Sequence, residues 1–131
     1  MTTFAYTIFY VQDVVKSIEF YEQAFGFKRK FIAPENVYAE LNTGNTTISF
    51  ASVAFANSNF SAGFSESSLS NKPFGVEIGF ATDNVEKTMQ QAIAAGGVLA
   101  QEAKEKPWGQ VVGYIRDLDG FLVEICTPMQ G

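Results

Sequence analysis

Two glutamates in otherwise apolar, strand-like stretches are the residues of this sequence best suited to chemistry. Glu77 lies in GVEIGFA and Glu124 lies in FLVEICT. A carboxylate that points into apolar surroundings costs several kcal/mol unless a partner satisfies it. If both side chains face one cavity, their repulsion raises the pKa of one, which suits an acid/base pair or a receptor for a cation. In the alternative interpretation each glutamate has a structural partner, such as Arg116, Lys106 or bound water.

Histidine is absent from the 131 residues, and Cys126 is the only cysteine. Ser-His-Asp and Cys-His nucleophilic machinery, histidine acid/base catalysis and zinc sites that use imidazole are therefore excluded. Any metal would have to be a hard cation held by carboxylates, hydroxyls and water. Cys126 has no disulfide partner within the chain, and we interpret it as a small core residue.

The composition predicts one soluble domain. Hydrophobic residues make up 47% of the chain, charged residues make up 18%, and the formal net charge is −5. No cluster of Lys or Arg interrupts this negative balance, so we expect no nucleic-acid partner. No apolar run approaches the roughly 20 residues that span a bilayer, and no basic segment precedes an apolar one at the N-terminus. We therefore expect a cytoplasmic protein without a membrane partner.

The chain contains an internal repeat with a spacing of seventy positions. Asp13 and Asp83 each precede a segment with apolar residues at helical spacing, and Gly26 and Gly96 follow at the same offset. Asp is a favoured N-cap and Gly a favoured helix stop, so both segments are predicted to be helices. Aromatic and β-branched runs predict one strand before each helix and three strands after it. The strands are expected at residues 4–11, 28–33, 37–42, 46–53, 76–82, 98–103, 111–116 and 121–126.

This pattern predicts an α+β protein with two βαβββ modules in a single domain, residues 1–131. Module one is expected over residues 1–53, a connecting loop over 54–73, and module two over 74–131. The loop is rich in Ser and Asn and carries Phe55, Phe60 and Phe64. Because a connection of this length is unusual in a compact domain, a lid, a dimer contact and a flexible surface loop remain open as interpretations.

Two segments of the chain resemble a known family. SIEFYEQAFGF and the terminal KPWGQVVGYIRDLDGFLVEICTP are similar to the corresponding segments of the vicinal oxygen chelate superfamily, which includes glyoxalase I, bleomycin resistance proteins and extradiol dioxygenases. Leu118 replaces the proline that is usual in the terminal turn. The resemblance implies a fold in which the curved sheets of two tandem βαβββ modules enclose a cleft. It also implies a homodimer, with a monomer that pairs its two modules within one chain as the alternative.

Metal-dependent members of this family place one ligand on each of four strands, and the matching positions here are Tyr6, Ser49, Glu77 and Glu124. Only Glu124 keeps the family's residue type, and the phenol and hydroxyl groups of Tyr6 and Ser49 hold their protons at neutral pH. We therefore favour no cofactor and no metal site. The alternative is a divalent ion, Mg²⁺, Mn²⁺ or Ca²⁺, held by Glu77 and Glu124.

The favoured function is that of a metal-free protein that binds a small molecule such as a drug or toxin, as antibiotic-resistance members of the family do. An aromatic, acidic cleft suits a planar or amine-bearing cation. The alternative is a glyoxalase-like lyase or isomerase in which Glu124 is the anchor and Glu77 shuttles a proton, and the lack of histidine disfavours a dioxygenase. A chain that serves only to partner another protein is a third interpretation. The residues expected to line the site are Tyr6, Tyr10, Ser49, Phe60, Glu77, Trp108, Tyr114 and Glu124.

Overall fold

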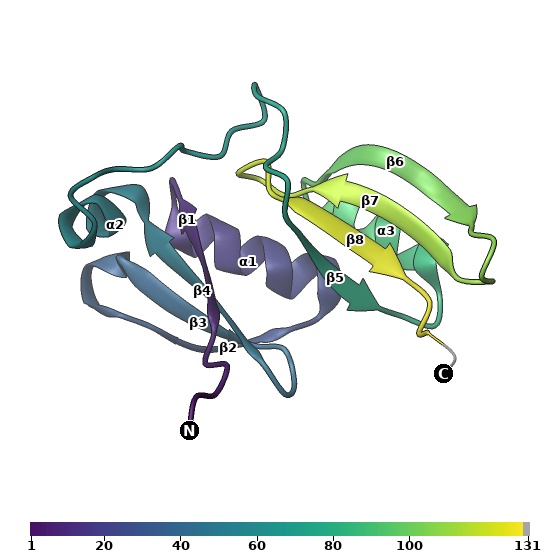
Figure 1. The fold of residues 1–131 in the computed structure, drawn as a ribbon, viewed down its shortest axis with the longest axis horizontal. Helices are drawn as coiled ribbons and strands as arrows, with labels where there is room; N and C mark the ends of the chain where they lie inside the picture. The colour runs from purple at the N-terminus through teal and green to yellow at the C-terminus, as the bar shows by residue number, and fades with distance from the viewer. Residues whose placement is uncertain (130–131) are drawn as a thin grey trace. The chain divides into compact units, whose positions relative to one another are not determined.

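The structure is a computed structural model that describes residues 1–129, so positions 130–131 of the predicted second module lie outside it. The fold class is the predicted one, α+β with two successive βαβββ motifs (Figure 1). The chain divides into two compact units. Unit 1 comprises residues 1–22 and 26–66, and unit 2 comprises residues 23–25 and the chain from residue 67 onward.

Unit 1 is built on a four-stranded mixed sheet in the order β1-β4-β3-β2. Strand β1 runs parallel to β4, and the other neighbours are antiparallel. Its elements are β1 (Thr7–Val11), α1 (Val14–Phe25) without its last three residues, β2 (Lys28–Ile32), the 3-10 turn η1 (Pro34–Asn36), β3 (Tyr38–Asn42), β4 (Thr47–Ser52) and α2 (Val53–Asn59).

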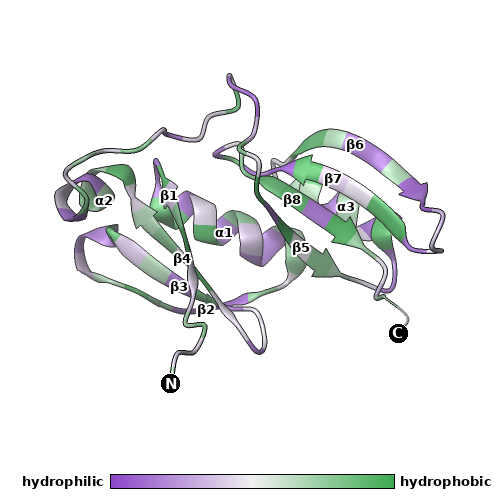
Figure 2. Ribbon diagram, in the orientation of Figure 1, coloured by the Kyte–Doolittle hydropathy of each residue, from purple (hydrophilic) through white to green (hydrophobic). Residues whose placement is uncertain are grey.

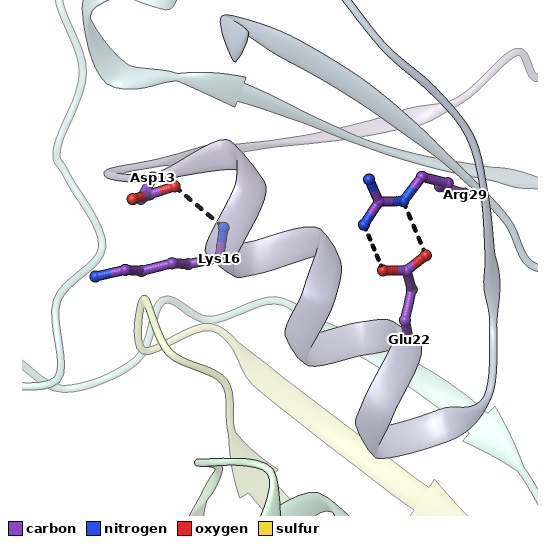
Figure 3. A network of polar contacts seen from close by, with 4 residues as sticks. All are labelled: Asp13, Lys16, Glu22 and Arg29. Carbon is purple, nitrogen blue, oxygen red and sulfur yellow. Dashed lines mark hydrogen bonds and ion pairs between the residues drawn. The ribbon is translucent and has the colours of Figure 1, made fainter.

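Helix α1 begins and ends where the sequence predicts. The Asp13 carboxylate caps its N-terminus by accepting a 3.1 Å hydrogen bond from the backbone N–H of Lys16 (Figure 3). Gly26 ends the helix at φ 74°, a left-handed conformation that glycine adopts without a Cβ penalty. Arg29 at the start of β2 holds Glu22 through two hydrogen bonds of 2.8 and 3.0 Å, and this guanidinium lowers the pKa of the Glu22 carboxyl.

The two faces of the unit 1 sheet differ in chemistry, as strand alternation predicts. Phe50 on β4 is fully buried, and its ring lies 5.2 Å from the ring of Tyr21 on α1 and 6.0 Å from that of Phe9 on β1. Its neighbour Ser49 points to the opposite face, toward Tyr38. The helix-facing side therefore forms the core, and the other side carries the polar groups.

Unit 2 repeats this architecture, with the sheet order β5-β8-β7-β6 and with β5 parallel to β8. Val123 and Ile125 of β8 are fully buried, whereas Glu124 between them points to the other face. Strands β5 and β8 are mostly apolar (Figure 2). Gly113 lets the helix pack closely, because a Cβ at this position would overlap the sulfur of Met89. The elements are β5 (Glu77–Ala81), α3 (Val85–Ala94), β6 (Val98–Glu105), β7 (Val111–Arg116) and β8 (Leu122–Cys126).

The prediction that Asp83 caps the second helix is wrong. Helix α3 begins at Val85, and its N-cap is Asn84, whose side chain accepts a 3.0 Å hydrogen bond from the backbone N–H of Lys87. The second helix thus starts one residue later than the repeat spacing implies. Asn is as good an N-cap as Asp, so the cap passes to Asn84 and the Asp83 side chain has no capping role.

The predicted loop 54–73 begins as a helix rather than as irregular chain. Ser52 caps α2 by accepting a 3.1 Å hydrogen bond from the backbone N–H of Phe55. Beyond α2, Phe64 packs on Tyr10 at a ring distance of 4.6 Å, and Glu66 accepts a 2.8 Å hydrogen bond from Gln12. Within residues 1–129, no helix combines the length and the apolar character that crossing a bilayer requires.

Candidate functional site

The predicted glutamates come together on the face of the unit 2 sheet opposite α3. Glu124 of β8 lies between Gly79 of β5 and Tyr114 of β7 in the strand register. The Tyr114 hydroxyl donates a 3.1 Å hydrogen bond to Oε1 of Glu124. Gly79 lies directly beside the carboxylate, since a Cβ there would be in van der Waals contact with Oε2 of Glu124 at 3.7 Å. Glu77 on β5 lies beside Glu124 and forms a carboxyl pair with it.

Glu77, Tyr114 and Cys126 retain their protons more strongly than such groups usually do. Partial burial raises the pKa of Glu77, and the hydrogen bond to Glu124 and the charge of Glu124 raise it further. Burial and the same carboxylate raise the pKa of Tyr114 to about 12 and also raise the pKa of the Cys126 thiol. Of the two neighbouring carboxyl groups, Glu77 is the one whose pKa is raised, as burial and a nearby negative charge predict.

A first prediction concerns pH and stability. The folded protein binds the Glu77 proton more tightly than the unfolded chain does, because the pKa of Glu77 is raised above its ordinary value of 4.5. The stability that Glu77 contributes is therefore complete below pH 4.5, and it is lost as pH rises through the folded-state pKa. The stability of Glu77→Gln relative to the wild type should therefore rise from acid to neutral pH. Urea unfolding at both pH values measures this, with Glu105→Gln as a control at an exposed carboxylate. Parallel pH profiles for Glu77→Gln and the wild type would contradict the prediction.

Arg116 is not the structural partner of either glutamate. Its Nε donates a 2.9 Å hydrogen bond to the carbonyl of Gly120, and Nη2 donates a 3.0 Å bond to the carbonyl of Ser68. A third, longer bond of 3.5 Å reaches the carbonyl of Leu69. The guanidinium thus ties the turn after β7 to the chain before β5. The interpretation in which Arg116 neutralises a glutamate is therefore wrong.

Unit 1 has a polar cluster of its own on the face of its sheet opposite Phe50. The Tyr38 hydroxyl lies 2.8 Å from Oε2 of Glu40 and 2.9 Å from Oγ of Ser49, which is fully buried. Burial raises the pKa of Tyr38, and the Glu40 carboxylate raises it further. Sequence reasoning found Ser49 but missed Tyr38 and Glu40. The signal was present, because Glu40 alternates with buried Ala39 and Leu41 as Glu124 does with its neighbours.

The remaining predicted residues are aromatic and lie in different places. Tyr6 precedes β1 and is 51% exposed, and Tyr10 packs on Phe64. Phe60 follows α2 and is 52% exposed. Trp108 lies in the β6–β7 hairpin, where it is 63% exposed and where its indole N–H donates a 2.8 Å hydrogen bond to Gln110. In unit 2 the structure thus joins Glu77, Tyr114 and Glu124, and it places Trp108 in the hairpin.

The donor set in unit 2 does not fit a resident metal ion. Glu77 and Glu124 are the carboxyl groups on this face, and the raised pKa values of Glu77, Tyr114 and Cys126 mean that these three groups give up their protons less readily than usual. Across residues 1–129, no three His, Cys, Asp or Glu side chains are grouped so that they could hold a metal ion. Two carboxyl groups without a third protein ligand make a weak site even for a hard cation. We therefore derive no chemical step through a metal.

The whole pattern of fold and motifs is that of one protein family. The family model described as the glyoxalase/bleomycin resistance protein/dioxygenase superfamily matches residues 3–125. The chain belongs to this family, which is the vicinal oxygen chelate superfamily that its two motifs resemble.

Individual relatives agree with this membership. The chain is 29% identical over 127 residues to a protein named lactoylglutathione lyase GLX1 from Arabidopsis thaliana, covering 93% of this chain but 43% of that protein. It thus spans less than half the length of the curated relatives it matches. A glyoxalase/bleomycin resistance protein/dioxygenase family enzyme from Burkholderia phytofirmans has a similar structure, with a TM-score of 0.82, 25% identity and coverage of 95% and 98% of the two chains. A glyoxalase-related enzyme from Fulvimarina pelagi shares the fold at a TM-score of 0.81 and 22% identity, with 98% of this chain and 89% of that one covered.

Proposed function

We propose that this protein binds a small organic cation without a metal ion, and that the carboxyl pair of Glu77 and Glu124 is the recognition element. The observation that carries the proposal is the partly desolvated pair with the Tyr114 hydroxyl on one oxygen of Glu124. The hydroxyl fixes the orientation of Glu124, while Glu77 remains exposed. A pair of neighbouring carboxyl groups is stabilised when it accepts hydrogen bonds from a positively charged amine.

The mechanism of this function is stoichiometric capture. At a pH where Glu77 is protonated, an amine that approaches the pair would displace the proton of Glu77, because a nearby positive charge favours the ionised form. Binding would then release a proton and strengthen as pH rises through the pKa of Glu77. The family name includes bleomycin resistance proteins, and a drug or toxin that carries an amine is the class of ligand we infer. A homodimer remains the expectation from the family resemblance, and a cytoplasmic location remains the expectation from the sequence.

A second candidate function is that of a lyase or isomerase. It is favoured by the raised pKa of Glu77 beside Glu124, because a carboxyl group with a raised pKa is better suited to donating and accepting a proton in general acid/base catalysis. It is favoured as well by the name lactoylglutathione lyase of the Arabidopsis relative. In this case Glu77 would move the proton and Glu124 would hold the substrate. Formation or consumption of lactoylglutathione that Glu124→Gln abolishes would establish it.

Calorimetric titration with a planar cation tests the proposed function. We expect 9-aminoacridine, which is cationic at neutral pH, to bind saturably, whereas anthracene-9-carboxylate, a planar anion with the same number of rings, does not bind. The titration is repeated in two buffers with different heats of ionisation, so that the released proton is counted. Equal binding of cation and anion, or no saturable heat with the cation, would contradict the proposal.

A further inference from the structure

We propose a second ligand site in unit 2, specific for an aromatic or quaternary organic cation, in the cavity between Asp83 and Trp108. The cavity has a volume of about 620 Å³, within the range of small-molecule pockets. Asp83 comes from the turn before α3, Trp108 and Gln110 come from the β6–β7 hairpin, and Thr127 and Met129 follow β8. Glu77 and Glu124 do not line it, so the inference stands apart from the proposed function.

Trp108 provides an aromatic wall that is held in place before any ligand binds. Its indole N–H donates a 2.8 Å hydrogen bond to Oε1 of Gln110, and Nε2 of Gln110 donates a 2.8 Å bond to the carbonyl of Thr127. Thr127 is fixed in turn, because its Oγ1 accepts a 3.0 Å bond from the backbone N–H of Val111. The ring nevertheless stays 63% exposed. An indole that is already oriented loses little freedom on binding, and Trp has the best face for a cation–π contact.

Asp83 provides a negative charge that the fold leaves unused. Its counterpart in the first unit, Asp13, caps α1. The one-residue offset of α3 gives the capping role to Asn84 instead. In the part of the chain that the structure describes, the Asp83 carboxylate has no hydrogen bond or ion pair, and it lies at the cavity. Because Asn84 already caps the N-terminus of α3, the Asp83 carboxylate remains available to a ligand.

The chemistry of the lining selects the class of ligand. The residues that line the cavity include Asp83 but no Lys or Arg, so a phosphate or carboxylate would be repelled. The indole face and the side chain of Met129 offer polarizable apolar contact. A ligand that combines a positive charge with an aromatic or methylated group satisfies both features. A quaternary ammonium suits the site well, because it has no N–H groups that need hydrogen-bond acceptors and requires only the negative charge and the aromatic face.

Fluorescence makes this inference directly testable, because Trp108 is the only tryptophan of the chain. Benzyltrimethylammonium chloride is titrated into the full chain, with tetramethylammonium and sodium chloride at equal ionic strength as references. We expect a saturable change in Trp108 emission. Asp83→Asn should weaken binding by about threefold to tenfold, the range for an ion pair combined with a cation–π contact at a partly exposed site. Glu86→Gln removes an equal charge from the first turn of α3 and should not change the affinity.

Calorimetry extends the test to variants without the fluorophore. Trp108→Leu should remove measurable binding, and Trp108→Phe, which keeps an aromatic face, should restore part of it; circular dichroism checks that each variant is folded. A linear emission change, or equal affinity in wild type and Asp83→Asn, would overturn the inference. If Glu124→Gln abolishes binding and Asp83→Asn does not, the probe occupies the carboxyl pair. In that case this inference fails while the proposed function stands.

Discussion

Gly120→Ala is expected to lower the free energy of unfolding by about 3 kcal/mol, because two separate costs fall on one residue. Gly120 has φ 89°, a conformation that L side chains rarely adopt. A Cβ there would also lie 2.7 Å from the carbonyl carbon of Ser68 and 2.9 Å from the amide nitrogen of Leu69. Both atoms belong to the backbone and cannot turn away.

The turn that contains Gly120 explains why this loss would spread. Oδ1 of Asp117 accepts 2.9 Å hydrogen bonds from the backbone N–H groups of Asp119 and Phe121, which fixes the turn between β7 and β8. Arg116 donates to the Gly120 carbonyl and to Ser68. Displacement of Gly120 would therefore loosen the chain before β5 as well as the start of β8, the strand that carries Glu124.

A matched glycine separates conformational strain from steric overlap. Gly109 has φ 94°, and a Cβ there would meet no atom within 4 Å. Gly109→Ala should therefore cost only about 1 kcal/mol. Urea unfolding followed by circular dichroism measures both variants. If Gly120→Ala does not fold, Gly120→Asn, which tolerates the dihedral but keeps the Cβ, should be unstable too. Equal losses at Gly109 and Gly120 would contradict the assigned contacts.

Glu124→Gln is expected to weaken 9-aminoacridine binding by about tenfold or more, because it replaces the carboxylate that the cation would contact with a neutral amide. The amide keeps the shape of the side chain, and it can still accept the hydrogen bond from Tyr114. Glu77→Gln should weaken binding less at low pH, where Glu77 already holds a proton, and more at high pH, where the wild type ionises.

The pH dependence of 9-aminoacridine binding separates the role of Glu77 from that of Glu124. In the wild type, affinity should rise with pH as Glu77 loses its proton, and in Glu77→Gln this rise should disappear. Glu105→Gln, which removes an equal charge at the exposed end of β6, should leave both the affinity and its pH dependence unchanged. Unchanged affinity in Glu124→Gln would place the ligand elsewhere.

Alternation along the strands made much of the fold and part of the site predictable. Phe50 and Ser49 are neighbours that point to opposite faces of the sheet, since Phe50 packs on Tyr21 and Ser49 contacts Tyr38. Glu77 and Glu124 were singled out because each interrupts an apolar strand, and β5 and β8 do pair in a register that brings them together. A period of two residues and a repeat spacing are both properties that a sequence displays directly.

The helix cap, the partners of Arg116 and the hydrogen bond of Trp108 could not be predicted from strand alternation. Asp83 and Asn84 are equally good caps, so only the observed start of α3 decides between them. The sequence offers Arg116 several possible hydrogen-bond acceptors. In the structure it donates to backbone carbonyls of a segment that lies almost fifty positions earlier in the chain. The hydrogen bond from Trp108 to Gln110 follows from the geometry of a hairpin rather than from any periodicity. These details depend on the three-dimensional position of loops, where local propensity is weak.

If the carboxyl pair of Glu77 and Glu124 acts without a metal ion, the purified protein should contain none, and metal analysis measures this. Mass spectrometry of the native protein is followed by calorimetric titration of Mn²⁺, Mg²⁺ and Zn²⁺ into the wild type and Glu124→Gln. We predict no bound metal, no saturable heat with any of the three ions, and 9-aminoacridine binding that persists in the presence of a chelator. Near-stoichiometric metal in the wild type that disappears in Glu124→Gln would contradict a metal-free function and make a metal-assisted lyase or isomerase the leading interpretation.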